Sequence, residues 1–138
     1  EPLEVAEDTV ITFYSLSYPN KHIYFLDDTR YGLPGQDPQE MAEYRKSIDE
    51  MCERIGVNLF RRKWRGAKAG MINDFLDFIG GEAREGFEFS NFSGKTPTEP
   101  IKYIVVFDAD QNPLPGFVEP LVERMEAEPN LAFIQTPQ

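Results

Sequence analysis

The sequence predicts an α/β fold in which helices flank both faces of a mainly parallel sheet. Helix-like and strand-like segments alternate along the chain, a pattern typical of right-handed crossovers between parallel strands. The central strand is expected at Tyr103–Phe107, an apolar run between Pro100 and Pro113 that is typical of a strand buried on both faces. Three predicted strands end in charged side chains, which should therefore gather at one edge of the sheet.

The first half of the chain contains two predicted helices and two predicted strands. Pro2 suits the first turn of the opening helix, and the first strand stops at Asp27 and Asp28. Asp37 or a neighbour should cap the second helix, and Gly56 should end it. These elements are expected at residues 3–16 (helix), 22–26 (strand), 39–55 (helix) and 57–60 (strand).

The second half continues the alternation after one long interruption. Residues 82–100 are polar and glycine-containing and predict a loop insertion, whose phenylalanines either cover a sheet edge or touch a partner. Gly70 lies inside a predicted helix at a cost of about 1 kcal/mol relative to alanine, which indicates a close approach by a ligand or by backbone. The remaining elements are expected at residues 67–79 (helix), 103–107 (strand), 115–125 (helix) and 131–134 (strand).

Composition places the chain among ordinary globular domains. It has 138 residues, of which 41% are hydrophobic and 28% charged, and no apolar run approaches the length of a membrane span. The net charge of −10 argues against nucleic acid or an anionic membrane surface as a partner. Cys52 and His22 are each alone, which excludes a disulfide framework and a cysteine or histidine-rich metal site; Cys52 is expected to be a core thiol.

Two carboxylates follow the predicted central strand. Asp108 and Asp110 would lie on one tight turn, where two like charges cannot both be desolvated without a compensating cation. Oxygen ligands combined with a bound phosphate suit Mg²⁺ or Mn²⁺. The alternative is that Asp108-Ala109-Asp110 forms only a solvated turn.

Five cations lie between Arg61 and Lys68 in an otherwise acidic chain. Lysine and arginine neutralise phosphate charge, so this cluster predicts an anion site. A solvated loop is the alternative interpretation.

Four segments together resemble one family, the processive glycosyltransferases of family 2, close to bacterial cellulose synthase catalytic subunits and related β-glucan synthases. Four motifs in this order and spacing are far more specific than any one of them. They are IYFLDDTR (23–30), GAKAGMIN (66–73), VFDAD (106–110) and FIQTPQ (133–138).

The resemblance implies a GT-A fold, a UDP-sugar donor, most often UDP-glucose, and inverting displacement at the anomeric carbon with Mg²⁺ or Mn²⁺. It places Asp27 and Asp28 at the nucleoside end of the donor and brings Lys68 and Gly70 close to the nucleotide. Asp108 and Asp110 form the metal-binding Asp-x-Asp pair, in which Asp108 also contacts the substrate and Asp110 is the direct metal ligand. The segment Gln135, Thr136 and Pro137 resembles the one beside the acceptor glucan.

Several parts of the family pattern are absent between residues 1 and 138. They are the first strand, the downstream acidic motif that supplies the general base, the Gln-x-x-Arg-Trp motif and the membrane helices. We therefore expect residues 1–138 to be the donor-binding part of a GT-A domain, a soluble piece of a longer parent protein at the cytoplasmic face of the membrane. We expect this piece alone to be inactive in polymerisation, because no general base can be named in it.

In the GT-A fold that the resemblance implies, the missing first strand lies centrally in the sheet, between the strand ending at Asp27 and the strand ending at Asp108. Unpaired strand edges invite pairing with another chain, so we expect a homodimer or a rearranged strand order.

Three other functions share features with these motifs. A haloacid-dehalogenase-type phosphatase also uses an Asp-x-Asp pair, but Asn112-Pro113 replaces its hydroxyl residue and Lys68 lies upstream. An EF-hand loop is disfavoured because Pro113 occupies the glycine position. The third rival is a non-catalytic fragment that binds UDP and metal, or a partner, without turnover.

Overall fold

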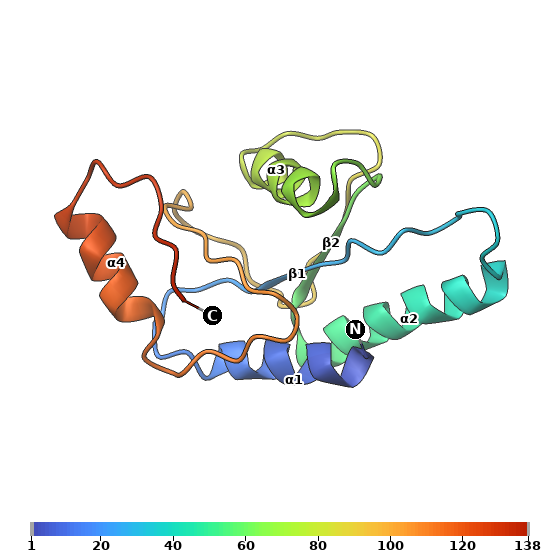
Figure 1. The fold of residues 1–138 in the computed structure, drawn as a ribbon, viewed down its shortest axis with the longest axis horizontal. Helices are drawn as coiled ribbons and strands as arrows, with labels where there is room; N and C mark the ends of the chain where they lie inside the picture. Colours follow the sequence, from blue (N-terminus) through green and yellow to red (C-terminus); the bar gives the residue numbers. More distant parts are fainter. Residues whose placement is uncertain (1, 138) are drawn as a thin grey trace. The chain divides into compact units, whose positions relative to one another are not determined.

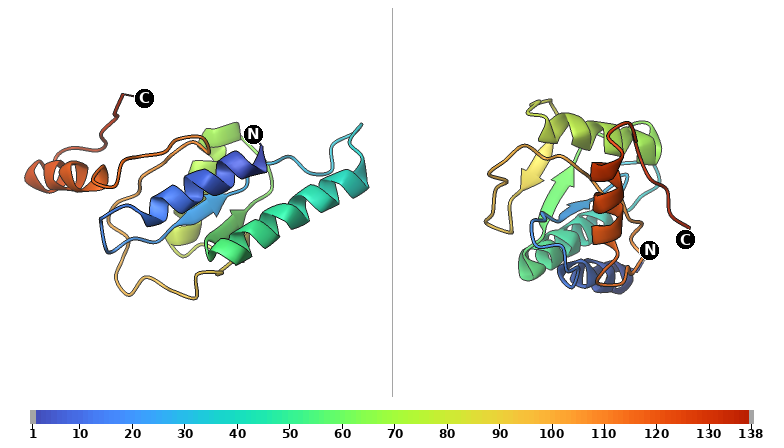
Figure 2. Two further views of the ribbon diagram at one scale, coloured as in Figure 1. Left: turned by 90° about the horizontal axis from the view of Figure 1, so that it is seen from below. Right: turned by 90° about the vertical axis from the view of Figure 1, so that its left-hand side faces the viewer.

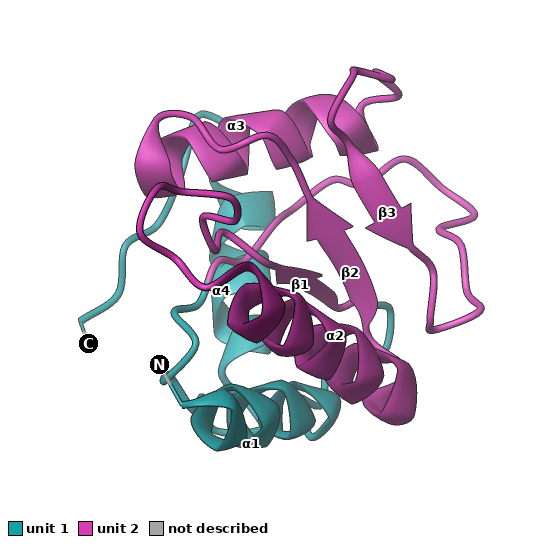
Figure 3. Cartoon of the chain, turned by 90° about the vertical axis from the view of Figure 1, so that its right-hand side faces the viewer, with its two compact units in different colours: residues 1–21, 107–138 teal, residues 22–106 magenta. Residues whose placement is uncertain are grey.

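The structure is a computed structural model that describes residues 2–137 as a small α/β chain (Figure 1). Two compact units are distinguished, of which unit 2 is His22–Val106 and unit 1 comprises the segments before and after it (Figure 3). The α/β class is thus confirmed, while Glu1 and Gln138 lie outside the described residues. The elements within 2–137 are α1 (Leu3–Tyr14), β1 (Tyr24–Leu26), α2 (Pro38–Ile55), β2 (Asn58–Arg61), α3 (Ala67–Ile79), β3 (Glu88–Ser90) and α4 (Val118–Ala127).

Unit 2 contains a three-stranded mixed sheet in the order β1-β2-β3. The β1–β2 pair is parallel, with Phe25 opposite Leu59, whereas β2 and β3 are antiparallel, with Phe60 opposite Phe89. Helices α2 and α3 cover opposite faces of this sheet (Figure 2). The expected mainly parallel sheet is therefore wrong for the described residues, because the strand that follows α3 returns antiparallel along β2.

The core of unit 2 is aromatic on the α3 face of the sheet. Phe60 is fully buried, and its ring centroid lies 5.6 Å from Phe75, 5.0 Å from Phe78 and 5.4 Å from Phe87. Side chains alternate along a strand, so Leu59 points to the α2 face. The buried residues of α2 are Ile48, Met51 and Cys52, and burial raises the pKa of the Cys52 thiol to about 12. The prediction that Cys52 is a core thiol is confirmed.

Helix α2 begins and ends where its sequence signals predict. The Asp37 carboxylate accepts a hydrogen bond from the Gln39 N–H at 3.0 Å, a cap of one of the otherwise unpaired first amides. Gly56 ends the helix with φ 81°, a conformation that favours glycine. None of the described helices, α2 included, is long and apolar enough to cross a membrane.

The segment 82–100 is not a loop throughout. It contains β3, which pairs with β2 and carries Phe89 beside Tyr24 and Phe78, with ring centroids 6.2 and 4.8 Å apart. Of the two alternatives for its phenylalanines, packing at the sheet edge is seen for Phe87 and Phe89, and contact with a partner stays a prediction. The alternation of Phe87 and Phe89 with Glu88 and Ser90 is the strand-like signal that the polar composition concealed.

Two predicted strands, 103–107 and 131–134, are wrong. Neither segment forms a strand, and Ile104, Val105 and Val106 are 43–47% exposed. A strand is stable only when its backbone N–H and C=O groups find partners on a neighbouring strand. No strand within residues 2–137 pairs with either segment, so β-propensity alone does not order them into a sheet.

Unit 1 is held together by aromatic contacts and by hydrogen bonds of Ser17. The ring of Phe107 lies 4.9 Å from Phe13 of α1 and 5.6 Å from Phe117, between centroids. The Ser17 N–H donates to the Pro115 carbonyl oxygen at 2.8 Å. These contacts join the segment after α1 to the segment before α4.

Candidate functional site

The carboxyl ends of β1 and β2 bring acidic and basic side chains together. Because the two strands are parallel neighbours, Asp27 and Asp28 after β1 meet Arg61 and Arg62 at the end of β2. Asp27 Oδ2 lies 2.7 Å from Arg61 Nε, and Asp28 Oδ1 lies 2.9 Å from Arg62 Nη2. The expectation that charged groups at these two strand ends converge is confirmed.

Asp27 is fully engaged by its own chain. Its carboxylate accepts hydrogen bonds from the Thr29 N–H at 3.1 Å, the Tyr31 hydroxyl at 2.7 Å and Arg61 Nε at 2.7 Å. Its side chain is 2% exposed. Burial, and then the hydrogen bond to Asp27, raise the pKa of Tyr31, so that residue stays protonated as a donor. Asp27 therefore fixes the loop that follows β1.

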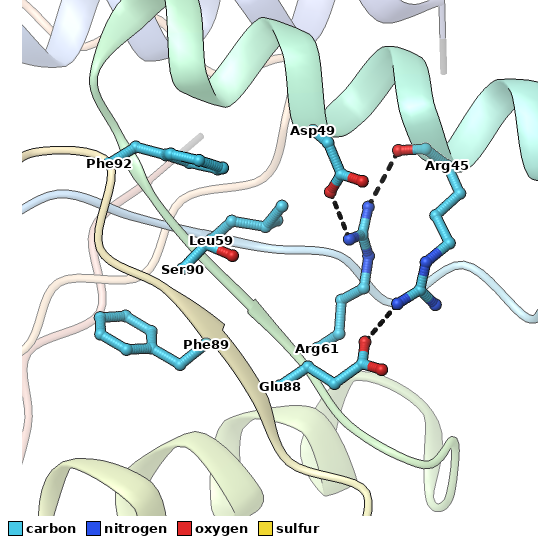
Figure 4. A pocket seen from close by; sticks show the side chains of 8 residues that line it. All are labelled: Arg45, Asp49, Leu59, Arg61, Glu88, Phe89, Ser90 and Phe92. Carbon is cyan, nitrogen blue, oxygen red and sulfur yellow. Dashed lines mark hydrogen bonds and ion pairs between the residues drawn. The ribbon is translucent and has the colours of Figure 1, made fainter.

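Arg61 connects the end of β2 to helix α2 (Figure 4). Its guanidinium donates to Asp49 and to the Arg45 carbonyl oxygen, and beside it Arg45 pairs with Glu88 of β3. Burial opposes the charge of Arg61, but the hydrogen bonds to Asp27 and Asp49 outweigh it and raise the pKa of the guanidinium. These residues line a cavity of about 440 Å³ in which each guanidinium faces a carboxylate.

We call the charged residues at the carboxyl ends of β1 and β2, namely Asp27, Asp28, Arg61 and Arg62, the rim. Arg62 has the most deeply buried side chain of its two cations. Its side chain is 1% exposed, and Nη2 donates to the Arg65 and Ala67 carbonyl oxygens at 3.0 and 3.1 Å. Its Nε lies 3.4 Å from Oδ2 of Asp74 in α3. The solvated-loop interpretation is therefore wrong for Arg61 and Arg62, which point inward to carboxylates and carbonyl groups on the adjoining elements. The anion site stays a prediction.

Asp28 differs from Asp27 in keeping part of its carboxylate in solvent. Its side chain is 31% exposed. Burial raises the pKa of Asp28 above its ordinary value, with Asp27 acting in the same direction and Arg62 and Arg30 opposing it. A partly exposed carboxyl group whose pKa is raised by its surroundings is a candidate for ligand contact.

The turn into α3 places Lys68 and Gly70 next to this rim. Gly66 and Ala67 have φ of 62° and 51°, and the Gly70 N–H donates to the Gly66 carbonyl oxygen at 2.9 Å. A Cβ on Gly70 would lie 2.0 Å from the Arg65 carbonyl oxygen, so the predicted close approach at Gly70 is confirmed for backbone. Lys68 is exposed in the first turn of α3.

A stacked pair joins the two loops of the rim. The Arg30 guanidinium carbon lies 3.6 Å from the ring centroid of Trp64, the single tryptophan of the chain. Arg30 belongs to the loop after β1, and Trp64 belongs to the loop after β2. This contact is a cation–π interaction that joins two loops separated along the chain by α2 and β2.

The predicted metal ligands lie on a turn in unit 1. The Gln111 side-chain oxygen accepts from the Asp108 N–H at 2.7 Å, and the Gln111 N–H donates to the Asp108 carbonyl oxygen at 3.1 Å. Asp108 is half-buried and Asp110 is exposed. Residues 2–137 hold no cluster of three or more His, Cys, Asp or Glu side chains that could bind a metal ion. Two carboxylates suit an Mg²⁺ or Mn²⁺ whose other ligands are phosphate and water.

The segment expected beside the acceptor also lies in unit 1. Gln135 and Pro137 are exposed, and Thr136 is half-buried. The predicted site residues are thus divided between the units. Unit 2 carries Asp27, Asp28, Lys68 and Gly70, and unit 1 carries Asp108, Asp110 and residues 135–137.

Sequence reasoning missed the buried partners that build the rim. Asp74 interrupts the apolar stripe of α3 next to Phe75, and it pairs with Arg62, Arg65 and Arg84. An acidic residue on the buried side of an amphipathic helix requires a cation within reach. That requirement, together with the excess of arginine after β2, is the signal that could have assigned Arg62 an inward role.

Comparison with known proteins confirms the resemblance that the four motifs predicted. The chain is 32% identical over 94 residues to "Cellulose synthase catalytic subunit [UDP-forming]" of Pseudomonas fluorescens strain SBW25. The aligned region covers 67% of this chain and 10% of that relative, so the chain spans a small part of the relative's length. No family model and no solved structure matches the chain.

Proposed function

We propose that the chain is the sugar-nucleotide-binding portion of a membrane-bound processive β-glycosyltransferase with a GT-A fold. In the parent protein it transfers glucose from UDP-glucose to a growing glucan, with inversion and with a divalent metal ion. The observation that carries this proposal is the similarity to a cellulose synthase catalytic subunit. The name of that relative describes it as UDP-forming. The order of the four motifs supports it.

The donor side of the proposed site is built from unit 2. Asp28 offers a partly exposed carboxylate to the nucleoside, and Lys68 offers a cation beside the nucleotide. Asp27 holds the loop on which Asp28 lies, through Thr29 and Tyr31. The different exposure of the two side chains, 2% for Asp27 and 31% for Asp28, supports a structural role for Asp27 and a ligand-binding role for Asp28.

Asp108 and Asp110 would hold the metal ion, with Asp110 as the direct ligand. The turn closed by Gln111 orients the Asp108 backbone, and the exposed Asp110 leaves room for phosphate and water on the metal. When bound, Mg²⁺ or Mn²⁺ neutralises charge on the departing diphosphate. Gln135, Thr136 and Pro137 contact the acceptor glucan in this proposal.

The experiment that tests the proposal is calorimetric titration of UDP into the full 138-residue chain, with and without Mn²⁺. We expect binding that requires Mn²⁺, is lost in Asp110→Ala and survives in Asp8→Ala, a matched control on the exposed face of α1. Absence of UDP binding by the folded wild-type chain would contradict the proposal for this chain.

The second candidate is a fragment that binds UDP and metal without turnover. The commitment of Asp27 to Thr29, Tyr31 and Arg61 favours it, because that carboxylate cannot serve as a general base. Incubation of the chain with radiolabelled UDP-glucose, Mn²⁺ and a cello-oligosaccharide separates the two candidates. Elongation of the oligosaccharide would show a competent transferase, and UDP binding without product is the result that we expect.

A further inference from the structure

We propose that Arg62 is a positioning residue that holds Asp28 and the turn before Lys68 and Gly70 in one fixed arrangement. This inference rests on the proposed function, because it assigns the buried arginine a role in organising the donor side of the site. It concerns a residue to which neither the motifs nor the similarity gives a role. The proposal is carried by the position of one guanidinium, which lies between a loop carboxylate, two carbonyl groups at the start of α3 and a buried carboxylate of that helix.

Each contact of Arg62 reaches a different segment of unit 2. Asp28, 2.9 Å away, lies after β1; the Arg65 carbonyl oxygen, at 3.0 Å, lies in the turn between β2 and α3, and the Ala67 carbonyl oxygen, at 3.1 Å, belongs to the first residue of α3. Asp74, 3.4 Å away, lies in α3. Because the Arg62 side chain is 1% exposed, water does not compete for these contacts. The position of Asp28 is therefore coupled to the position of the turn.

The α3 end of this network is anchored independently. The Asp74 side chain is 2% exposed and also pairs with Arg65 and with Arg84, the latter at 2.9 Å. Asp74 thus provides a fixed point in the core against which Arg62 is oriented. Of the two carbonyl groups that Arg62 binds, that of Ala67 immediately precedes Lys68, so movement of the guanidinium displaces the first turn of α3.

Gly70 completes the packing of this turn. A Cβ at that position would lie 2.0 Å from the Arg65 carbonyl oxygen, the same oxygen that accepts from Arg62 Nη2. The carbonyl is therefore held from one side by Arg62 and can approach α3 closely only because residue 70 has no side chain. Among the contacts of Arg62 with the described residues, only Nη2 donates hydrogen bonds, to the Arg65 and Ala67 carbonyl oxygens, while Nε meets Asp74 as an ion pair. The planar guanidinium places these contacts on two different nitrogens, which a lysine ammonium on a flexible stem does not reproduce.

The first test compares two arginine-to-lysine variants in the full chain. For Arg62→Lys we expect UDP affinity in the presence of Mn²⁺ to fall by at least about tenfold, the loss typical when a group that orients a ligand contact is removed. For the matched control Arg45→Lys, whose side chain pairs with Glu88, we expect a change within about twofold. Circular dichroism at the titration temperature establishes that each variant is folded. Equal affinities in Arg62→Lys and wild type would overturn the proposal.

The second test needs neither a variant nor a ligand, so it is independent of the proposed function. In the wild-type chain, NMR follows the Asp28 carboxyl carbon and the Arg62 Nε–H through a pH titration. Asp28 faces Arg62, Asp27 and Arg30, and positioning by Arg62 requires the Nε–H signal to move with the same midpoint as Asp28. An Arg62 signal that is unaffected while Asp28 titrates would overturn the proposal. Loss of UDP binding in the wild type, with this coupling present, would instead count against the proposed function alone.

Discussion

Asp27 and Asp28 are adjacent in the chain, yet each pairs with a different arginine and only Asp28 retains substantial exposure. Asp27 lies 2.7 Å from Arg61 Nε with a side chain that is 2% exposed, and Asp28 lies 2.9 Å from Arg62 Nη2 with 31% exposed. The two residues directly follow β1, and successive side chains of an extended chain point to opposite sides. One carboxylate therefore points inward, and the next remains at the surface. The two residues should therefore respond oppositely to the same substitution.

Asp27→Asn should destabilise the chain strongly. The substitution removes the charge opposite Arg61, and breaking a buried ion pair by neutralising one partner typically lowers the free energy of unfolding by about 3–5 kcal/mol. Asp49 still pairs with Arg61, so we expect the lower end of that range. Urea unfolding followed by circular dichroism measures the change. A midpoint equal to that of the wild type would contradict the structural role of Asp27.

Asp28→Asn should leave the fold intact or slightly more stable at pH 7. A carboxyl group whose pKa is higher in the folded chain binds its proton more tightly when folded. Its contribution to stability is present below the unfolded pKa and is lost as the pH rises through the folded pKa. Asparagine mimics the protonated form, so we expect Tm to rise at pH 7.

The same Asp28 variant should show no gain in Tm at pH 3, where the wild-type carboxyl group is protonated in both states. Differential scanning calorimetry at the two pH values checks the sign. If the proposed function is right, UDP affinity falls in this variant although its stability does not. A variant that is destabilised at pH 7 as strongly as Asp27→Asn would show that Asp28 is a structural residue as well.

The sequence predicted the local elements of unit 2 well because their signals are local. The cap at Asp37, the stop at Gly56 and the apolar spacing of α3 depend on neighbouring residues only, and each is confirmed. The strand predicted at Tyr103–Phe107 failed because a strand also needs a partner, and partner availability is not encoded in the run itself. Strand β3 was missed for the opposite reason, since its pairing with β2 outweighs its polar composition.

The candidate site, like the sheet, could be predicted only where it depends on local signals and not on partners that lie elsewhere in the chain. The convergence of Asp27, Asp28, Arg61 and Arg62 follows from parallel strand order, which the alternation of elements indicated. Which of these charges point inward depends on the partners that other elements supply, here Tyr31, Asp49 and Asp74. Those partners lie 4, 12 and 12 residues from the side chains they bind, and no motif marks them.

Gly70→Ala should destabilise the turn into α3 even though alanine is the better helix former. A Cβ at residue 70 would lie 2.0 Å from the Arg65 carbonyl oxygen, which must move away. Overpacking of this kind lowers the free energy of unfolding by about 1–3 kcal/mol, which offsets the gain of about 1 kcal/mol in helix propensity. Thermal unfolding measures the change.

Gly116→Ala is the matched control for the Gly70 variant. A Cβ at Gly116 would meet no atom of the described chain within 4 Å, so we expect Tm to change by less than about 2 °C. If Gly70→Ala were as stable as this control, the close approach of Arg65 to α3 would not constrain the turn, and the arrangement proposed for Arg62 would lose one of its supports.

The segment that contains the exposed apolar residues Ile104, Val105 and Val106 should mediate association between two copies of the chain. Ile104, Val105 and Val106 are 43–47% exposed and form no strand, although their composition strongly favours one. An exposed segment of this kind satisfies its backbone groups by pairing with the same segment of a second copy. We expect sedimentation velocity to show a monomer–dimer equilibrium that shifts toward dimer as the protein concentration rises.

Val105→Lys should shift this equilibrium to monomer, because two like charges would face each other across a symmetric pair of strands. Leu114→Lys is the control, since Leu114 is 78% exposed and apolar but lies outside the segment. If loss of apolar surface alone were responsible, both variants would dissociate to the same degree. A wild-type chain that remains a compact monomer at every concentration would rule out pairing through this segment.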